Sequence, residues 1–420
     1  MIQTTEILPG VFLHTCTDHR FKQGCLSLQL VRPMDKAEAA MNALLPAVLL
    51  RGCKNSPDLR AITLRLDDLY GAAVGTLTRR VGDYHTTGLC CNFIEEKYAL
   101  PGDRLLQPML DFMGELLLQP VTENGCFCPD FVEGEKRNLL AAIEAQRNDK
   151  RFYVNQQLLL HMCKQDSFSI PRLGNAQQVA AITPEALWAH YQSILQTSQL
   201  EIFYVGAAAH NQIAQTLTQL LSPIPRTYSP LPPQTGFTAC PPDTYTEQMD
   251  VSQGRLAMGF VTPITLRDKD FAAMQVCNTV FGSGMTSKLF AVIREKMSLC
   301  YDIGTTYHGS KGIVTLCAGI DFDKEDAVVD AIQQQLQLCR DGQITDLELS
   351  SAKQAIISQL KSTHDSPGAI ENYYGTVALS GLRLSPAQYM EAVEQVTREQ
   401  VAAAAETLEL HTRFFLKGVQ

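Results

Sequence analysis

One strand-like segment occurs twice in this chain, and the repeat limits how the sequence can fold. Residues 23–33, QGCLSLQLVRP, are matched by residues 253–263, QGRLAMGFVTP, with Gln, Gly, Leu, Val and Pro identical at the same spacing. Apolar residues alternate in both copies, which indicates a half-buried strand. An Ala-rich segment with helical periodicity follows each copy, at residues 35–50 and 268–281. The pattern predicts two copies of one fold.

The two halves also end alike. Residues 200–206, LEIFYVG, resemble residues 412–418, TRFFLKG, and each reads as a strand that stops at Gly. Between the halves lies a stretch rich in Pro and Ser, which propagates neither helix nor sheet. A chain of 420 residues also exceeds what one hydrophobic core usually serves. We therefore predict a domain at 1–221, a linker at 222–244 and a second domain at 245–420.

Helical and strand patterns recur in the same order in both halves. Alternating segments at 72–81 and 84–93 predict a hairpin in the first half. Amphipathic, helix-like stretches occupy residues 103–118, 130–147, 153–162, 324–338, 346–362 and 368–380. Strands, then helices, then a return strand favour a mostly antiparallel sheet packed with helices. The fold class is thus α+β, with two tandem homologous domains.

Charge and cysteine content exclude several classes of protein. The formal net charge is −9, which argues against binding nucleic acid or an anionic membrane. The chain carries 13 cysteines, an odd number, and many lie in apolar runs where free thiols pack like small hydrophobes. No signal peptide or apolar stretch of about 20 residues is present. We expect a cytoplasmic protein.

Two passages carry a family resemblance. They are residues 26–73, which include MNALLPAVLLRGC, and residues 281–301, FGSGMTSKLFAVIREKMSLCY. Together with the duplication, they resemble the pitrilysin/insulinase family of zinc metallopeptidases over essentially the whole chain. The resemblance implies the mitochondrial processing peptidase-like fold, in which small two-domain members work as paired subunits.

In active members of that family, a helix of the first domain carries the inverted zinc motif H-x-x-E-H. Two His one turn apart bind the metal, and the Glu activates the metal-bound water. When the sequences are matched at Arg51-Gly52, the two ligand positions are Ala43 and Ala47, and the position of the base is Pro46. None of these side chains offers a donor atom or a titratable group. We also expect Pro46 to kink the helix unless it lies in the first turn.

The third zinc ligand of the family, a Glu on a later helix, corresponds to Ala142. Glu135 remains two turns earlier, where the family often keeps a second acidic residue. The ligands and the base are therefore lost together. We predict no zinc site and no catalytic residue in this chain, so it is not expected to be an enzyme on its own.

The second passage keeps the family's substrate-binding pattern. The resemblance assigns Arg294 and Tyr301 to holding a substrate peptide and its oxyanion over the zinc of a facing active site. A guanidinium and a phenol suit that chemistry. The alternative is structural: Arg294 pairs with a surface carboxylate, and Tyr301 packs in the core. The motif Gly282-x-Gly284-x-x-x-Lys288 does not have the spacing of a phosphate-binding loop.

Two functional hypotheses follow. In the first, the chain is a catalytically inactive subunit that binds peptide and completes the active site of a zinc-bearing homologous partner. It then needs no cofactor of its own, because zinc belongs to the partner. In the second, the chain is a non-proteolytic peptide-binding or scaffold protein, such as a homodimer. A zinc peptidase that uses other ligands is a third hypothesis. The loose clusters His14, Cys16, His19 and Cys126, Cys128 are not specific for a metal, and we expect ordinary loop or core positions for them.

Overall fold

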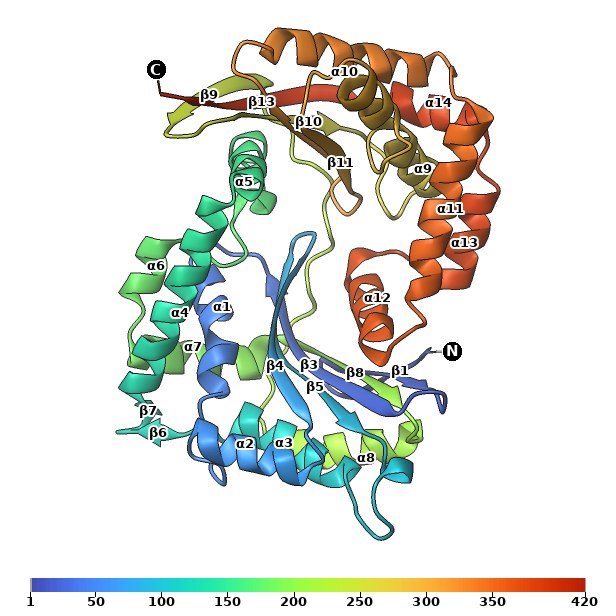
Figure 1. The fold of residues 1–420 in the computed structure, drawn as a ribbon. Helices are drawn as coiled ribbons and strands as arrows, with labels where there is room; N and C mark the ends of the chain where they lie inside the picture. The colour runs from blue at the N-terminus through green and yellow to red at the C-terminus, as the bar shows by residue number, and fades with distance from the viewer. Residues whose placement is uncertain (1, 420) are drawn as a thin grey trace. The chain divides into compact units, whose positions relative to one another are not determined.

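The chain folds into two compact units, described for residues 2–419 by a computed structural model (Figure 1). The described residues are divided between a first unit of 2–144, 170–233 and 364–379 and a second unit of 145–169, 234–363 and 380–419. Each unit contains one main β-sheet with helices packed on it.

The units are not consecutive blocks of the chain. Residues 145–169 belong to the second unit, and residues 364–379 belong to the first. The sequence-based division at 1–221, 222–244 and 245–420 does not include this exchange, in which each half of the chain gives one segment to the other unit. The amphipathic patterns located these helices but not the sheet on which each one packs.

The first unit is built on a mixed sheet in the order β1-β2-β8-β3-β5-β4. Its strands are β1 (Ile2–Leu8), β2 (Val11–Thr17), β3 (Gln23–Pro33), β4 (Ala73–Val81), β5 (Tyr84–Ile94) and β8 (Gln199–Gly206). Neighbours run antiparallel, except that β2 and β8 are parallel. A short hairpin of β6 (Thr122–Glu123) and β7 (Cys126–Phe127) lies apart from it.

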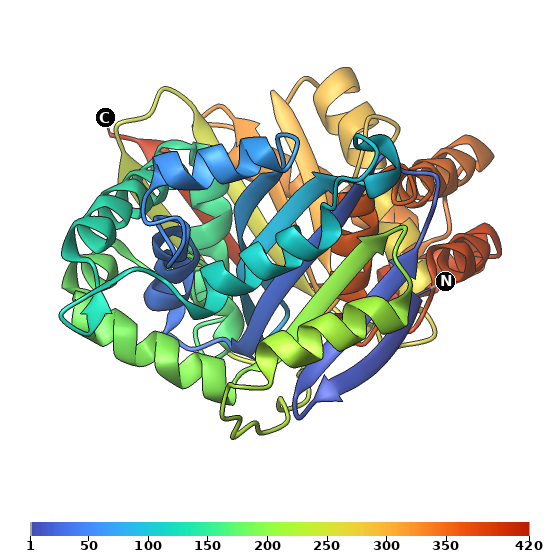
Figure 2. The ribbon, with the colours of Figure 1, turned by 90° about the horizontal axis from the view of Figure 1, so that it is seen from below.

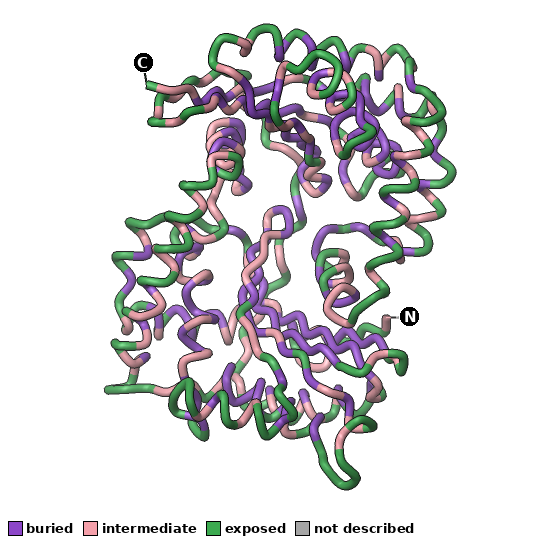
Figure 3. The backbone as a smooth tube through the Cα atoms, viewed as in Figure 1, coloured by how far each residue is buried: buried purple, intermediate pink, exposed green. Residues whose placement is uncertain are grey.

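Helices cover both faces of this sheet. They are α1 (Ala39–Leu49), α2 (Leu59–Asp68), η1 (Glu96–Tyr98), α3 (Leu106–Leu118), α4 (Pro129–Asn148), α6 (Ala176–Ala181), α7 (Pro184–Thr197), α8 (His210–Leu221) and α12 (Pro367–Ser380). Figure 2 shows α3 and α8 lying across one face. Leu26 and Leu28 of β3 belong to the core there with Met109 and Phe112 of α3, and the strands are buried along much of their length (Figure 3).

The second unit repeats this architecture. Its sheet has the order β11-β12-β10-β13-β9, with strands β9 (Asp243–Met249), β10 (Gly254–Val261), β11 (Asp302–His308), β12 (Ile313–Ile320) and β13 (Glu409–Gly418). The order matches β4-β5-β3-β8-β2 of the first unit, and β13 and β9 form the corresponding parallel pair. The repeated segments become β3 and β10, at equivalent positions. The predicted α+β class with two homologous domains is confirmed.

The exchanged helix α5 (Lys150–Met162) packs on β10 and β13 of the second unit. Its Val154 and Leu158 are buried against Phe414 of β13. Gly259 allows the close approach, because a Cβ atom there would lie 2.4 Å from Sδ of Met162. The unit also contains η2 (Ser167–Ser169), α9 (Phe271–Phe281), η3 (Leu289–Lys296), α10 (Glu325–Arg340), α11 (Asp346–Ser362), α13 (Pro386–Glu394) and α14 (Arg398–Glu406).

The Pro-rich stretch between α8 and β9 contains no helix or strand, and its second part is fixed to the second unit. The fully buried ammonium of Lys311 lies 2.9 Å from Asp166 and donates to the carbonyls of Thr235 and Gly236. No helix within residues 2–419 is both long enough and apolar enough to cross a membrane.

The other exchanged helix, α12, is held on the first sheet by the buried carboxylate of Glu371. Odd-numbered residues of β3 point away from α3, so Ser27 and Gln29 face α12 and donate to Glu371 at 2.8 and 2.7 Å. Arg79 of β4 donates from both terminal nitrogens, at 3.1 and 2.8 Å. A buried carboxylate is tolerated only when its oxygens are paired in this way.

We expect Glu371→Ala to destabilise the first unit by about 2–4 kcal/mol, because it leaves Arg79 and two buried donors without their acceptor. Hydrogen exchange of the α12 amides should accelerate in the same variant. The matched control is Glu144→Ala on the exposed face of α4, which should change stability by less than about 0.5 kcal/mol. Unchanged exchange in α12 would contradict this role of Glu371.

Candidate functional site

The helix at the zinc-motif position, α1, is built as a core helix. Leu44, Leu45 and Pro46 are buried, whereas Ala43 and Ala47 are half-buried. The methyl groups of Ala43 and Ala47, one turn apart, thus stand at the positions where the sequence predicts that the zinc ligands are lost. These residues do not fit a zinc ion, because the described side chains at these positions provide no donor atom.

Pro46 lies inside α1 rather than in its first turn. A proline cannot donate to the carbonyl four residues earlier, which here belongs to Asn42. The hydroxyl of Thr87 on β5 donates to that carbonyl instead, at 2.5 Å. The helix is assigned continuously from Ala39 to Leu49, so the hydrogen bond lost at Pro46 is replaced from the sheet.

The two remaining positions of the degenerate motif lie on α4. Ala142 is exposed. Glu135 accepts a hydrogen bond from Nη1 of Arg51 at 3.2 Å, and the Arg51 guanidinium also lies over the ring of Phe131. The Glu135 carboxylate thus links Arg51, which follows α1, to α4. Within residues 2–419, no three His, Cys, Asp or Glu side chains are grouped so that they could hold a metal ion.

The loose cluster at the N-terminus is occupied by hydrogen bonds. Nε2 of His14 lies 2.5 Å from Glu201, and its Nδ1 lies 2.9 Å from the hydroxyl of Thr4. Its ring stacks on Phe203. Both nitrogens of His14 are therefore used within the first unit.

A buried polar cluster lies beside α1. Nε2 of His190 lies 2.7 Å from Oδ1 of Asn42, and Nδ2 of Asn42 lies 3.4 Å from Nδ1 of His85. Burial, with Arg80 and Arg172 nearby, lowers the pKa of His85 to about 4, and burial also lowers the pKa of His190. Both imidazoles are therefore neutral at pH 7.

Arg294 and Tyr301 share one pocket in the second unit, of about 320 Å³. Nε of Arg294 donates to the carbonyl of Tyr301 at 2.9 Å, and Nη1 donates to Glu295 at 2.8 Å. The guanidinium also lies over the ring of Phe290. Tyr301 is 60% exposed, so it is not a core residue. The pairing of Arg294 with a surface carboxylate, expected from the structural alternative, does occur.

The Tyr301 hydroxyl is directed at a carboxylate. It donates to Oδ1 of Asp321 at 2.8 Å, while Lys324 approaches Oδ2 at 2.6 Å. This bond raises the pKa of Tyr301, and Lys324 together with Tyr301 lowers the pKa of Asp321. The phenol is therefore a neutral donor at pH 7, and any substrate acceptor must compete with Asp321 for its proton.

Arg294 is carried by η3, a π-helical segment. The π-helical geometry is shown by the hydrogen bond from the amide of Met297 to the carbonyl of Val292, because these residues are five positions apart instead of the four of an α-helix. Leu289 and Ile293 are fully buried and anchor the segment, and Ser298 follows with a positive φ of 53°. Extended π-helices are rare and often occur at functional sites.

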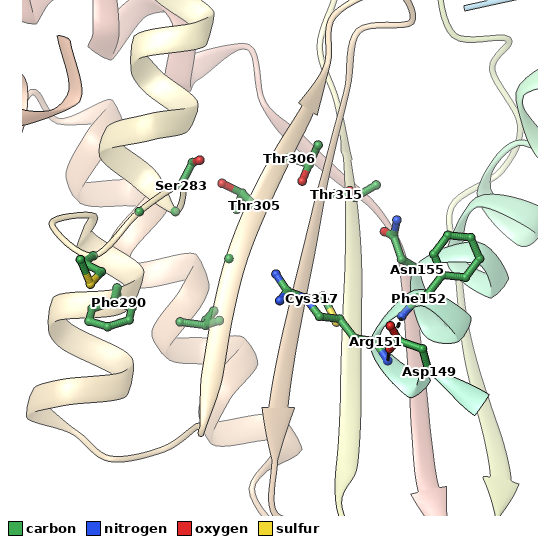
Figure 4. A pocket seen from close by; sticks show the side chains of 15 residues that line it. Asp149, Arg151, Phe152, Asn155, Ser283, Phe290, Thr305, Thr306, Thr315 and Cys317 are labelled. Carbon is green, nitrogen blue, oxygen red and sulfur yellow. Dashed lines mark hydrogen bonds between the residues drawn. The ribbon is translucent and has the colours of Figure 1, made fainter. Parts of the chain in front are cut away.

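A second hollow, the β11 groove, was not predicted from the sequence. It has a volume of about 490 Å³ and is lined by the start of α5 with Asp149, by the turn 282–285 with Phe290, by residues 303–306 of β11, and by Thr315 and Cys317 of β12. Figure 4 shows α5 on one side of these strands and the Gly-rich turn on the other. The passage 281–301, which the sequence singles out, supplies one wall of this groove. The other wall is the start of α5, more than a hundred residues earlier in the chain, so no local pattern connects the two walls.

The Gly-rich turn does not form a phosphate site with Lys288. The ammonium of Lys288 is buried and bonds both carboxylate oxygens of Glu348, at 2.9 and 3.1 Å. The carbonyl of Gly282 instead accepts the amide of Thr305 on β11, at 3.1 Å. The turn is thus fastened to the edge of the sheet.

We expect the purified chain to contain substoichiometric zinc, since α1 offers no ligand. The variant Ala43→His/Ala47→His/Ala142→Glu restores three ligand types and should bind one zinc per chain. Pro46 still replaces the base, so the variant should not hydrolyse peptides. In the control variant, Ala142→Glu is replaced by Ala141→Glu, which points to another side of α4. Stoichiometric zinc in the unmodified chain, measured by mass spectrometry of the metal, would refute the assignment.

We expect His85 to contribute a pH dependence to stability. Its pKa in the folded chain, about 4, lies below its value in the unfolded chain, about 6.5, so the unfolded chain binds more protons between these values. The stability that neutral His85 provides is therefore complete above pH 6.5 and falls as the pH drops toward 4. Denaturant unfolding across this range should show a shallower slope for His85→Gln. Equal slopes in both proteins would contradict the assignment.

Comparison with known proteins identifies relatives. A profile of the family described as "Peptidase M16 inactive domain" matches residues 181–356. The chain is 31% identical over 411 residues to "Probable inactive metalloprotease YmfF" of Bacillus subtilis, covering 98% of this chain and 96% of that one. A crystal structure of a conserved protein from Enterococcus faecalis superposes with a TM-score of 0.92 at 26% identity, covering 100% of this chain and 99% of that one.

A crystal structure of a peptidase M16 inactive domain from Pseudomonas fluorescens has the same fold, with a TM-score of 0.80 at 19% identity and coverage of 100% and 98%. The resemblance seen in the two sequence passages is confirmed by these matches. The chain belongs to the M16 family of peptidases, the pitrilysin/insulinase family, as a homologue of its inactive members.

Proposed function

We propose that this chain is a non-catalytic, peptide-binding subunit that pairs with a homologue carrying an intact H-x-x-E-H helix. One contrast carries the proposal: Ala43, Pro46 and Ala47 provide no catalytic group, whereas Arg294 and Tyr301 remain together in an open pocket. A chain that had lost every role in handling substrate would not need an exposed tyrosine and arginine held in this geometry.

Arg294 and Tyr301 would act on a substrate held at the partner's metal. The Tyr301 hydroxyl is a neutral donor, and Nη2 of Arg294 has no hydrogen-bond partner among residues 2–419. Donors of this kind stabilise the negative charge that develops on a peptide carbonyl during hydrolysis. Zinc belongs to the partner in this proposal, and both chains function in the cytoplasm.

The β11 groove supports the peptide-binding part of the proposal. β11 is an edge strand, and Thr305 directs its amide away from β12 to Gly282. Because bonded directions alternate along an antiparallel strand, Ile303 also directs its amide and carbonyl outward. The Thr305 amide is already bound to Gly282, whereas the amide and carbonyl of Ile303 have no hydrogen-bond partner among residues 2–419 on this side and can pair with one residue of a peptide.

A scaffold that binds peptides without cleaving them is the second candidate. It is favoured by the bond from Tyr301 to Asp321, which holds the phenol away from other acceptors. In that case the chain has no zinc-bearing partner, and a homodimer is the expected assembly. An H-x-x-E-H homologue that co-purifies with the chain distinguishes the first candidate from this one.

The test is to express the chain alone and together with an H-x-x-E-H homologue from the same genome. We expect the pair to cleave internally quenched peptides in a chelator-sensitive manner. Arg294→Ala and Tyr301→Phe should each lower kcat/KM of the pair by about 10- to 100-fold, as expected for the loss of a transition-state donor. Arg383→Gln, an exposed arginine outside both pockets, is the matched control.

Two results would contradict the proposal. Chelator-sensitive cleavage by the chain alone would show that it carries its own active site. Full activity of the pair with Arg294→Ala would show that the pocket does not take part.

A further inference from the structure

The outer edge of β9 is an open strand edge of the second unit. The first sheet has one strand more than the second, since β1 covers β2, the strand that corresponds to β9. The residues before β9 cannot form such a cover strand, because Pro241 and Pro242 directly precede it and proline has no amide to donate. Figure 1 shows β9 at the margin of its sheet, and within residues 2–419 no strand pairs with its outer side.

The pairing of β9 with β13 determines which backbone groups point outward. The two strands are parallel, and the amide of Val419 donates to the carbonyl of Met249. Met249 therefore directs its backbone groups toward β13. Because these directions alternate along a strand, Thr244, Thr246 and Gln248 direct their amides and carbonyls away from β13.

Most of these outward groups are available for pairing. The Thr244 amide is the exception, since it donates to Oδ1 of Asp243 at 2.8 Å. The amides of Thr246 and Gln248 and the carbonyls of Thr244, Thr246 and Gln248 form no hydrogen bond with any residue from 2 to 419. The side chains of these three residues are exposed and uncharged. The edge thus offers donors and acceptors to a further strand.

The other three edge strands carry features that oppose pairing. The register of β1 shifts after Glu6, and on β4 the carbonyl of Thr78 accepts Nη1 of Arg172 at 2.7 Å. On β11, the amide of Thr305 is bound to the Gly-rich turn. Bulges and covering contacts of this kind usually protect a sheet edge. β9 contains no proline, and its register with β13 is continuous.

The strand is complementary to a second copy of itself. When two β9 strands run antiparallel about Thr246, each Thr246 faces its counterpart and each Thr244 faces a Gln248 of the other copy. These are the residues whose backbone groups point outward, so they form the hydrogen-bonded pairs of an antiparallel ladder. The β-branched Thr side chains also suit cross-strand pairs.

The carboxylates of β9 do not oppose one another in this arrangement. On the α5 face, Glu247 lies opposite Tyr245 of the second copy, and Asp243 lies opposite Met249 of that copy. No charge is therefore placed directly against a like charge, which would destabilise the pairing. Glu247 is also bound within its own chain, where it accepts the hydroxyl of Tyr153 at 2.8 Å.

We propose that the outer edge of β9 pairs with β9 of a second copy of this chain, in an antiparallel ladder centred on Thr246. The two second-unit sheets then form one continuous sheet. The inference goes beyond the proposed function, because this edge shares no residue with the Arg294 and Tyr301 pocket or with the β11 groove. One strand pair makes a small interface, so the association is weak and depends on concentration.

The test is sedimentation velocity of the full chain between about 1 and 200 μM, a range suited to a small interface. We expect monomer at the lower end and dimer at the upper end. Thr246→Pro removes an outward amide from each copy and should weaken the dimer at least about tenfold. Thr246→Lys opposes two like charges and should weaken it about two- to fivefold. Thr63→Lys, on the exposed face of α2, is the matched control and should change nothing.

Hydrogen exchange provides a readout that needs no variant. The amides of Thr246 and Gln248 should exchange more slowly in concentrated than in dilute protein, whereas the amides of β1 should not change. The Thr246 amide takes no part in the ladder with β13, so circular dichroism should show Thr246→Pro folded like the parent. If that variant does not fold, hydrogen exchange and Thr246→Lys decide the question.

Three results would overturn the proposal. The first is a chain that stays monomeric at every concentration. The second is a dimer whose affinity and β9 exchange are unaffected by Thr246→Lys and Thr246→Pro. The third is slowed exchange of β9 that appears only after an H-x-x-E-H homologue is added, since that result assigns the edge to the homologue. Peptide hydrolysis by the mixed pair is a separate measurement, so its success or failure leaves these results unchanged.

Discussion

Each sheet of this protein buries one face under a helix taken from the other half of the chain, and the rest of the structure depends on this exchange. Val154 and Leu158 of α5 supply the apolar cover for the second sheet, whereas Glu371 of α12 binds polar groups of the first. Neither half of the sequence can therefore complete its own unit. The exchange also places the start of α5 beside β11, so the groove exists only because a helix of the first half crosses to the second unit.

Two contacts secure α1 and the residue that follows it, Arg51. Thr87 supplies the hydrogen bond that Pro46 cannot make, and Arg51 binds the remaining acidic residue, Glu135. Both contacts fix α1, one to the sheet and one to α4. Without these contacts the Asn42 carbonyl of α1 would lack a partner and the Glu135 carboxylate of α4 would lose its cation, and each loss is costly in a partly buried setting.

Much of the fold could be predicted from the sequence, because period-two and helical patterns are local. The repeated segment identified β3 and β10 as equivalent, and the Ala-rich segment that follows the first copy forms the helix α1. The exchange could not be predicted, since an amphipathic helix shows that it has a buried face but not which sheet covers it. The β11 groove was missed for a related reason: it joins residues near 150 with residues near 284 and 304, and nothing in the local pattern connects them.

Arg294 and Arg151 illustrate two settings of a guanidinium in one unit. Arg294 is held by the Tyr301 carbonyl, Glu295 and the ring of Phe290, so its side chain keeps little conformational entropy. Arg151 has no such support and keeps its reach. It lines the β11 groove together with Asp149, and its guanidinium forms no ion pair or hydrogen bond within residues 2–419. A guanidinium held like that of Arg294 is positioned before any acceptor arrives, whereas the Arg151 side chain would have to be ordered first, at a cost in entropy.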